Sequence, residues 1–155
     1  MDMLIPAIFE SLSVAGSDVK EFLGWRKKAK GDARSLIDEL KDNMTYLKMV
    51  ARNEIDLGAV IDKISISEYK RLSKEGFGFN TLKGKKIAKY SSLQGTDLSS
   101  WTGKKTEDLV MSIYEKINDL KIRYPLVSKR KNYRWNVRVN NIRKRIWLLL
   151  IHVRS

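Results

Sequence analysis

WNVRVNNIRKRIWLLLIHV, residues 135–153, is the stretch that decides the fold class of this chain. Its apolar side chains recur at alternating steps of four and three residues, the spacing of a helix that packs along one seam. The seam consists of Trp135, Val139, Ile142, Ile146, Leu149 and Val153. From Trp147 to Ile151 the segment is apolar on nearly every side, so we expect a central helix or a docking surface for a protein partner. A short strand is the alternative for residues 133–139, which also alternate with period two.

Two further segments lie directly upstream of this helix. Residues 105–124 show a second helical pattern, which begins near Thr106 and is ended by Pro125. Residues 125–134 form a basic connection between the two helices. Residues 53–104 are predicted to form short helices and ordered loops, because glycines interrupt a series of aromatic and aliphatic residues there.

Residues 6–52 have the pattern of a helical hairpin. Apolar residues at helical spacing are followed by a basic cluster, which is favourable at the C-terminal end of a helix. Gly31 is then the expected helix end, and Asp32 is the expected cap of the second helix. Three acidic residues fall off the apolar stripe of that second helix and are expected to face water: Asp38, Glu39 and Asp42.

The composition is that of one globular domain. A chain of 155 residues with 43% hydrophobic and 32% charged residues can bury a core within a single domain, residues 1–155. Together with the helical patterns, this predicts an all-α bundle of four to six helices with an ordered, glycine-punctuated loop region in the middle. No apolar run approaches the ~20 residues that span a bilayer, and the N-terminus lacks the basic start of a signal peptide. We therefore expect a cytoplasmic protein.

The residue inventory excludes several functional classes. The chain has no cysteine, which rules out disulfides, cysteine-bound zinc, iron–sulfur clusters and a thiol nucleophile. Its single histidine is His152, and no motif marks a nucleophile. The glycine-lysine segments 83–89 and 103–106 lack the spacing of a phosphate-binding loop, although backbone N–H groups at the helix start after Gly103 could hold a phosphate. We expect a non-enzymatic protein without a metal or cofactor.

The charge of the chain points to an anionic partner. The formal net charge is +13, which favours nucleic acid, an anionic lipid surface or an acidic protein. The positive charge is concentrated after Asp119, where residues 120–155 hold eleven lysines and arginines and no acidic residue. The C-terminal segment is therefore the place to look for a binding surface.

One edge of the C-terminal helix carries the candidate site. Residues 134, 138, 141 and 145 follow each other at steps of four and three, so they share a helix face, and a basic connection precedes them. The predicted nucleic-acid-binding residues are Lys129, Arg130, Lys131, Arg134, Arg138, Asn141 and Arg145. Arginine suits bidentate phosphate contacts and stacking on bases, and asparagine can read a base edge. The alternative is a solvated face of a core helix, paired with acids such as Asp38 and Asp42.

A second alternative is catalytic. Arg145 and His152 are seven residues apart and lie on one helical face. This pair, on a helix of a small bundle, is similar to the motif of the HEPN family of ribonucleases. The resemblance covers only the segment from Arg145 to His152 and the helical architecture, and the polar residue that usually follows the arginine is here Ile146. It implies that Arg145 and His152 would act on an RNA phosphodiester.

A third alternative is a helical bundle that binds a protein or a membrane surface. Residues 4–30 are apolar first and cationic last, a pattern that suits shallow insertion at an anionic surface. The main hypothesis remains a non-enzymatic basic protein that binds nucleic acid, or another polyanion, through its C-terminal arginine-rich segment.

Overall fold

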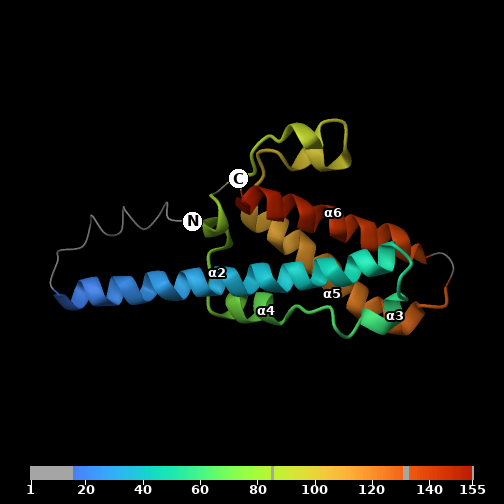
Figure 1. The fold of residues 1–155 in the computed structure, drawn as a ribbon, viewed down its shortest axis with the longest axis horizontal. Coiled ribbons are helices and arrows are strands. Elements are labelled where there is room, and N and C mark those ends of the chain that lie inside the picture. The colour runs from blue at the N-terminus through green and yellow to red at the C-terminus, as the bar shows by residue number, and fades with distance from the viewer. Residues whose placement is uncertain (1–15, 85, 131–132, 155) are drawn as a thin grey trace.

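The computed structural model describes residues 16–84, 86–130 and 133–154, and the fold of this part is all-α, with helices in the predicted number (Figure 1). Its helices are α2 (Gly16–Ala51), α3 (Leu57–Val60), α4 (Ser67–Lys74), α5 (Thr106–Val127) and α6 (Trp135–Arg154). Three short 3-10 turns lie between α4 and α5: η1 (Phe79–Leu82), η2 (Ser91–Leu93) and η3 (Asp97–Trp101).

The core lies where α2, α5 and α6 meet. Figure 1 shows α2 as the longest element, with α6 running alongside it. Leu36 and Leu40 of α2 are fully buried, as are Ile113 of α5 and Ile146 and Leu149 of α6. Burial of one such side chain stabilises the fold by about 1.5–3 kcal/mol. The seam predicted for residues 135–153 is therefore a core seam, and the segment forms a central helix rather than a strand.

Helix α2 corrects the expected hairpin in residues 6–52. It continues without interruption through Gly31 and Asp32 to Ala51, and residues 6–15 lie outside the described part of the chain. Gly31 costs about 1 kcal/mol relative to alanine within a helix. The buried side chains of Ala33 and Leu36, which follow it directly, outweigh this loss. Asp32 caps no helix but accepts a hydrogen bond from the Lys28 ammonium, 3.0 Å away.

Pro125 also fails to end its helix at the predicted boundary. Helix α5 continues through it to Val127, three residues beyond the predicted end at 124. A proline inside a helix removes one backbone donor. So close to the end of α5 this loss leaves the last turn intact.

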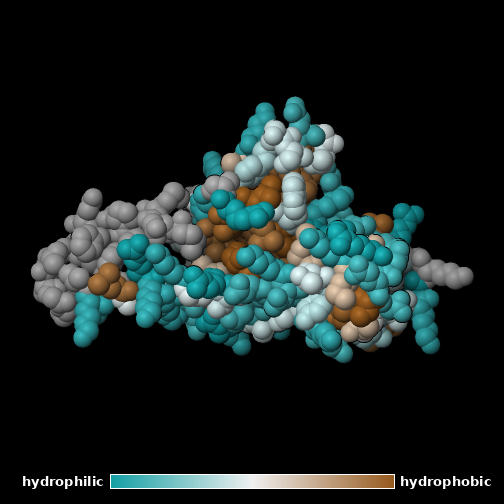
Figure 2. Space-filling model, in the orientation of Figure 1, coloured by the Kyte–Doolittle hydropathy of each residue, from teal (hydrophilic) through white to brown (hydrophobic). Residues whose placement is uncertain are grey.

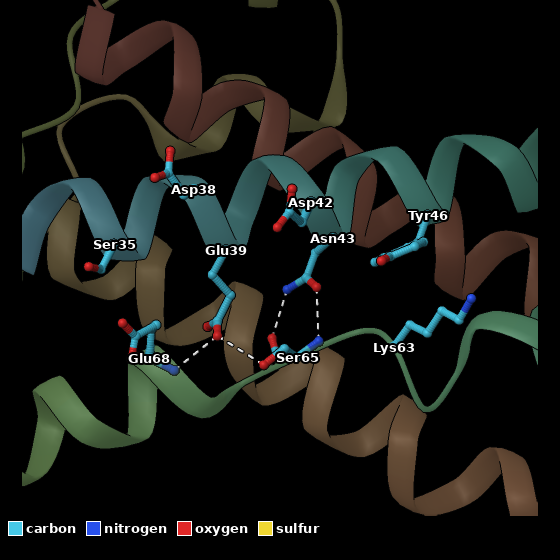
Figure 3. A pocket seen from close by; sticks show the side chains of 9 residues that line it. All are labelled: Ser35, Asp38, Glu39, Asp42, Asn43, Tyr46, Lys63, Ser65 and Glu68. Atoms are coloured by element: carbon cyan, nitrogen blue, oxygen red, sulfur yellow. Dashed lines mark hydrogen bonds between the residues drawn. The ribbon is translucent and has the colours of Figure 1, made fainter.

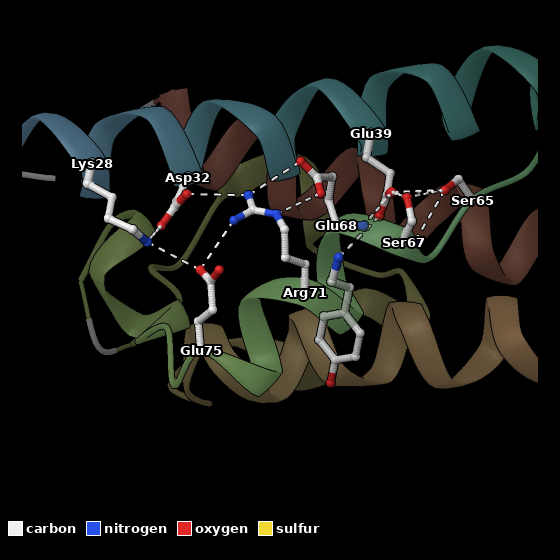
Figure 4. A network of polar contacts seen from close by, with 9 residues as sticks. Lys28, Asp32, Glu39, Ser65, Ser67, Glu68, Arg71 and Glu75 are labelled. Carbon is white, nitrogen blue, oxygen red and sulfur yellow. Dashed lines mark hydrogen bonds and ion pairs between the residues drawn. The ribbon is translucent and has the colours of Figure 1, made fainter.

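A polar network joins α4 to α2 (Figure 4). The Glu39 carboxylate accepts hydrogen bonds from the hydroxyls of Ser65 and Ser67 at 3.0 and 3.2 Å. It also accepts one from the backbone N–H of Glu68 at 2.9 Å, where α4 begins. Glu39 is 7% exposed, so the prediction that it faces water is wrong, whereas Asp38 and Asp42 are exposed as predicted. A side chain of α2 thus supplies the acceptor that the start of α4 requires.

The same network continues along α2 in both directions. Asn43, one turn beyond Glu39, donates to the Ser65 carbonyl at 2.8 Å and accepts from the Ser65 N–H at 2.9 Å. Toward the N-terminus, Arg71 of α4 pairs with Asp32 of α2 at 3.3 Å and with Glu68 at 3.0 Å. The connection between α3 and α4 and the whole of α4 are therefore fixed to one face of α2.

Candidate nucleic-acid interface

A groove of about 570 Å³ lies between α5 and α6. The two helices are antiparallel, because Asp119 in the second half of α5 contacts Arg138 near the start of α6, while Thr106 at the start of α5 contacts His152 near the end of α6. The lining residues are Glu115, Lys116, Asp119, Leu120, Tyr133, Arg134, Val137, Arg138, Asn141 and Ile142. Three of the predicted binding residues, Arg134, Arg138 and Asn141, thus line one groove.

Arg138 is held in place by both charge and ring contacts. Its guanidinium pairs with the Asp119 carboxylate at 3.0 Å. It also lies over the rings of Tyr133 and Trp135, 5.3 and 5.8 Å from their centroids. These two rings are stacked on each other, with centroids 5.3 Å apart and an interplanar angle of 18°. One edge of the groove is therefore a layered arrangement of two aromatic rings and a guanidinium.

The remaining predicted residues divide into three groups. Lys129 and Arg130 are exposed in the connection that follows α5. Lys131 lies outside the described residues. Arg145 does not line the groove, and its Nη1 donates to the carbonyl of Asn141 on its own helix at 2.9 Å. Of the helix face predicted from spacing, the part from Arg134 to Asn141 lines the groove, and Arg145 lies outside it.

Several other cations of the C-terminal segment have structural partners. The Lys121 ammonium donates to the backbone carbonyls of Ile61 and Ile64, just beyond α3, and partial burial lowers the pKa of this lysine. Lys144 pairs with Asp97 of η3 at 3.7 Å.

The acidic partners of the basic edge differ from those expected. The predicted alternative paired the basic face with Asp38 and Asp42, but the carboxylate in contact with Arg138 is Asp119. Asp119 also accepts from Arg123 at 2.7 Å. The spacing of 119 and 123, one helical turn, was the available sequence signal for that second pair. Nothing in the sequence placed Asp119 beside Arg138.

His152 is a buried structural side chain. It is 3% exposed, its Nδ1 lies 2.8 Å from the Tyr90 hydroxyl, and its Nε2 lies 3.0 Å from the Thr106 hydroxyl. The Thr106 hydroxyl donates its proton to the Gly84 carbonyl at 2.7 Å. Because the Thr106 hydroxyl has no second proton, it accepts a hydrogen bond from the Nε2–H of His152. The unprotonated Nδ1 then accepts a hydrogen bond from the Tyr90 hydroxyl. Burial, and then the charge of Lys83, lowers the pKa of His152, in agreement with a neutral ring.

This environment gives no support to the ribonuclease alternative. A general acid or base must reach the reacting atoms of its substrate. Both ring nitrogens of His152 are engaged inside the protein, and Arg145 bonds to its own helix.

A second pocket, of about 370 Å³, lies between α2 and the segment from Lys63 to Glu68 (Figure 3). Its lining is mainly acidic and polar and consists of Ser35, Asp38, Glu39, Asp42, Asn43, Tyr46, Lys63, Ser65 and Glu68. Glu39 and Asn43 are committed to the fold through Ser65. Within the described residues, no group of three or more histidine, cysteine or acidic side chains is arranged to hold a metal ion.

The apolar end of α6, expected to be a core or a docking surface, is mostly core. Leu148 and Leu149 are fully buried, Leu150 and Ile151 are half-buried, and Trp147 is 38% exposed. Trp147 lines a third pocket, formed with residues of α2 and η3. Figure 2 shows charged and polar residues over much of the visible face, with apolar residues gathered around the C-terminal end of α6. Among the described helices, none is long and apolar enough to cross a membrane.

Comparison with protein-family models, with curated proteins and with solved structures finds no match to this chain.

Proposed function

We propose that this protein binds single-stranded nucleic acid in the groove between α5 and α6. The observation that carries the proposal is the layered edge of the groove, in which Tyr133, Trp135 and Arg138 lie against each other. Proteins that bind single strands combine aromatic rings, on which bases stack, with cations that follow the phosphate backbone. At this edge of the groove the aromatic rings of Tyr133 and Trp135 lie next to the cationic side chain of Arg138.

The chemistry of the lining residues suggests a division of roles. Tyr133 is half-buried, so part of its side chain is accessible to a base. Arg134, Lys129 and Arg130 are exposed next to it and suit phosphate contacts. Asn141, on the groove wall, can donate to and accept from a base edge.

The acidic residues of the groove favour a single strand over a duplex. Glu115 and Asp119 line the groove and would repel a phosphate backbone laid along it. The same carboxylates can accept hydrogen bonds from the amino groups of unpaired bases. An unpaired strand can turn its bases into the groove and keep its phosphates near the exposed cations. A duplex cannot do this.

Fluorescence anisotropy with a labelled oligonucleotide of about 20 nucleotides tests the proposal. Tyr133→Ala should weaken binding about 5- to 150-fold, because stacking contributes about 1–3 kcal/mol per base. Tyr133→Phe keeps the ring and should bind like the wild type. Equal affinity of the alanine and phenylalanine variants would contradict the stacking role.

The salt dependence of the same binding reaction tests the cationic role. Arg134→Gln should reduce the slope of log affinity against log salt by about 0.7, the value for one phosphate contact on a single strand. Lys41→Gln on α2 removes the same charge from another exposed position and should leave the slope close to that of the wild type. If both variants behave alike, the groove is not the binding surface.

A further inference from the structure

Two lysine-rich segments that are far apart in the sequence lie side by side in the fold. Lys86 and Lys105 form an isolated antiparallel β-bridge. Next to it, the Ile87 N–H donates to the Lys104 carbonyl at 2.8 Å, and the Gly103 N–H donates to the Ile87 carbonyl at 2.9 Å. Gly84 and Gly103 have φ values of 124° and 83°, which glycine adopts readily, and they turn the chain on either side of the bridge.

We call the side chains gathered here the lysine bridge. Its members are Lys83, Lys86, Lys89, Lys104 and Lys105. Lys83 is half-buried and the other four are exposed. Within the described residues, the ion pair made by this group joins Lys105 to Glu107 at 4.0 Å, at the outer limit of such a contact. The lysine bridge therefore presents a strong excess of positive charge.

The lysine bridge is fastened to the core. Ile87, at its centre, is 2% exposed. The Gly84 carbonyl accepts from Thr106 of α5, and Thr106 in turn accepts from His152 of α6. On the other side of the lysines, Tyr90 donates to His152. Because the backbone is fixed at these points, the lysines are held together before any ligand binds, which lowers the entropic cost of binding.

Lysine suits contacts with phosphate better than arginine-type recognition of base edges. Its ammonium is a compact point charge that contacts phosphate without the planar, bidentate geometry by which arginine recognises base edges. Lys104 also lies over the half-buried Trp101 ring, 4.8 Å from its centroid, which keeps its charge close to the surface.

The lysine bridge and the groove lie along the same side of α6. Arg138, Arg145 and His152 follow each other at steps of seven, so they share one stripe of this helix. Arg138 meets α5 at the groove, and His152 meets α5 beside the lysine bridge. The two places are separated by the 14 residues of α6 from Arg138 to His152, which is about 21 Å along the helix axis.

We propose that the lysine bridge is a second contact for the sugar–phosphate backbone of the strand that the groove binds. This inference rests on the proposed function. Nucleotides stacked at about 3.4 Å need about six steps to cover about 21 Å, so a strand of about five, with four steps, occupies only one of the two places. A strand of about 20 nucleotides reaches both.

The test is a length series with a charge-neutral variant of the lysine bridge. Anisotropy is measured with oligothymidylate of about 5 and about 20 nucleotides. Lys86→Gln combined with Lys104→Gln should weaken binding of the long strand about tenfold. The variant should also reduce its salt slope by about 1.4, equal to two contacts of 0.7 each. Binding of the short strand should stay unchanged.

The control removes two charges elsewhere. Lys41→Gln combined with Lys74→Gln changes exposed positions on α2 and α4. It should bind both strands like the wild type. Thermal unfolding of both double variants checks that they remain folded, and the exposed positions predict an unchanged midpoint.

The outcomes separate this inference from the proposed function. If the lysine-bridge variant binds the long strand as the control does, the second contact is wrong and the groove proposal stands. If the wild type binds neither strand, the proposed function itself is wrong. Loss of both lengths to the same extent would overturn the two-contact arrangement. Sedimentation with phosphatidylserine vesicles that disappears in the variant, while oligothymidylate binding persists, would assign the lysines to lipid and overturn the inference.

Discussion

At the scale of the residue, the groups that organise this protein are polar side chains whose partners lie far away in the sequence. Glu39 contacts Ser65 and Ser67 across 26 and 28 residues, and Arg138 meets Asp119 across 19. Periodicity assigns a residue to a face of its own helix and carries no information about which element covers that face. For this reason the sequence predicts Glu39 in water and does not identify Asp119 as the partner of Arg138.

Replacing Glu39 tests the network at the start of α4. Glu39→Ala removes the shared acceptor of two hydroxyls and a backbone N–H and should lower the free energy of unfolding by about 2–3 kcal/mol. Asp38→Ala, at the exposed neighbouring position, should change it by less than about 0.5 kcal/mol. Urea unfolding of both variants gives the comparison. Equal values would mean that Glu39 contributes no more than a surface acid.

His152 should make the stability depend on pH below neutrality. Its pKa is lowered in the folded protein, so the unfolded chain binds a proton first as the pH falls below about 6.5. The stability is fully present above that value and decreases as the pH falls toward the folded pKa. Among the described residues, Tyr90 and Thr106 hydrogen-bond to the ring, and the charge of Lys83 acts on it.

Urea unfolding at about pH 7.5 and pH 5.5 measures this effect. The wild type should be less stable at the lower pH, and His152→Gln should lose most of the difference although it is less stable at both. A pH dependence that survives in this variant would assign the titration to other groups.

At the scale of the element, residues 135–153 were predicted almost to the residue, whereas the N-terminal hairpin was not. The observed helix α6 spans Trp135–Arg154, and an unbroken seam of six apolar residues favours a helix over this length more strongly than the period-two pattern of residues 133–139 favours a strand. In α2, the signals for a break at Gly31 and Asp32 were local, and the packing of Ala33 and Leu36 against the core was not visible in the sequence. The sequence predicts only the basic edge of the groove, which belongs to α6. The opposite wall belongs to α5, and no sequence pattern indicates that α5 packs there.

Two glycines give a matched test of this correction. A Cβ at Gly31 would meet nothing within 4 Å, so Gly31→Ala should stabilise the continuous helix by about 0.5–1 kcal/mol. A Cβ at Gly76 is equally unhindered, but the φ of 75° there is unfavourable for alanine. Gly76→Ala should therefore destabilise the protein by about 1 kcal/mol. A hairpin with its turn at Gly31 would instead make Gly31→Ala destabilising, and thermal unfolding decides between the two.

At the scale of the whole molecule, the excess of positive charge makes stability and nucleic-acid affinity respond to salt in opposite directions. A net charge of +13 repels itself in the compact state, and added salt screens this repulsion. The same salt weakens contacts with phosphate. Stability and nucleic-acid affinity should therefore change in opposite directions.

Raising sodium chloride from about 20 to about 200 mM should increase the midpoint of thermal unfolding and decrease the affinity for oligothymidylate. A variant with Lys41, Lys70 and Lys74 changed to glutamine carries less repulsion and should show a smaller increase in the midpoint. A midpoint that falls with salt in the wild type would show that ion pairs such as those of Arg71 outweigh the repulsion.

The contact between Thr106 and His152 has a consequence for the order in which the protein is assembled during synthesis. These residues are 46 positions apart, and a ribosome adds about 5–20 residues per second. Several seconds therefore pass between the translation of the lysine-rich segments and that of the histidine that locks them in place. During this interval the nascent chain carries its lysines without their final support. The cationic surface is thus completed late in translation.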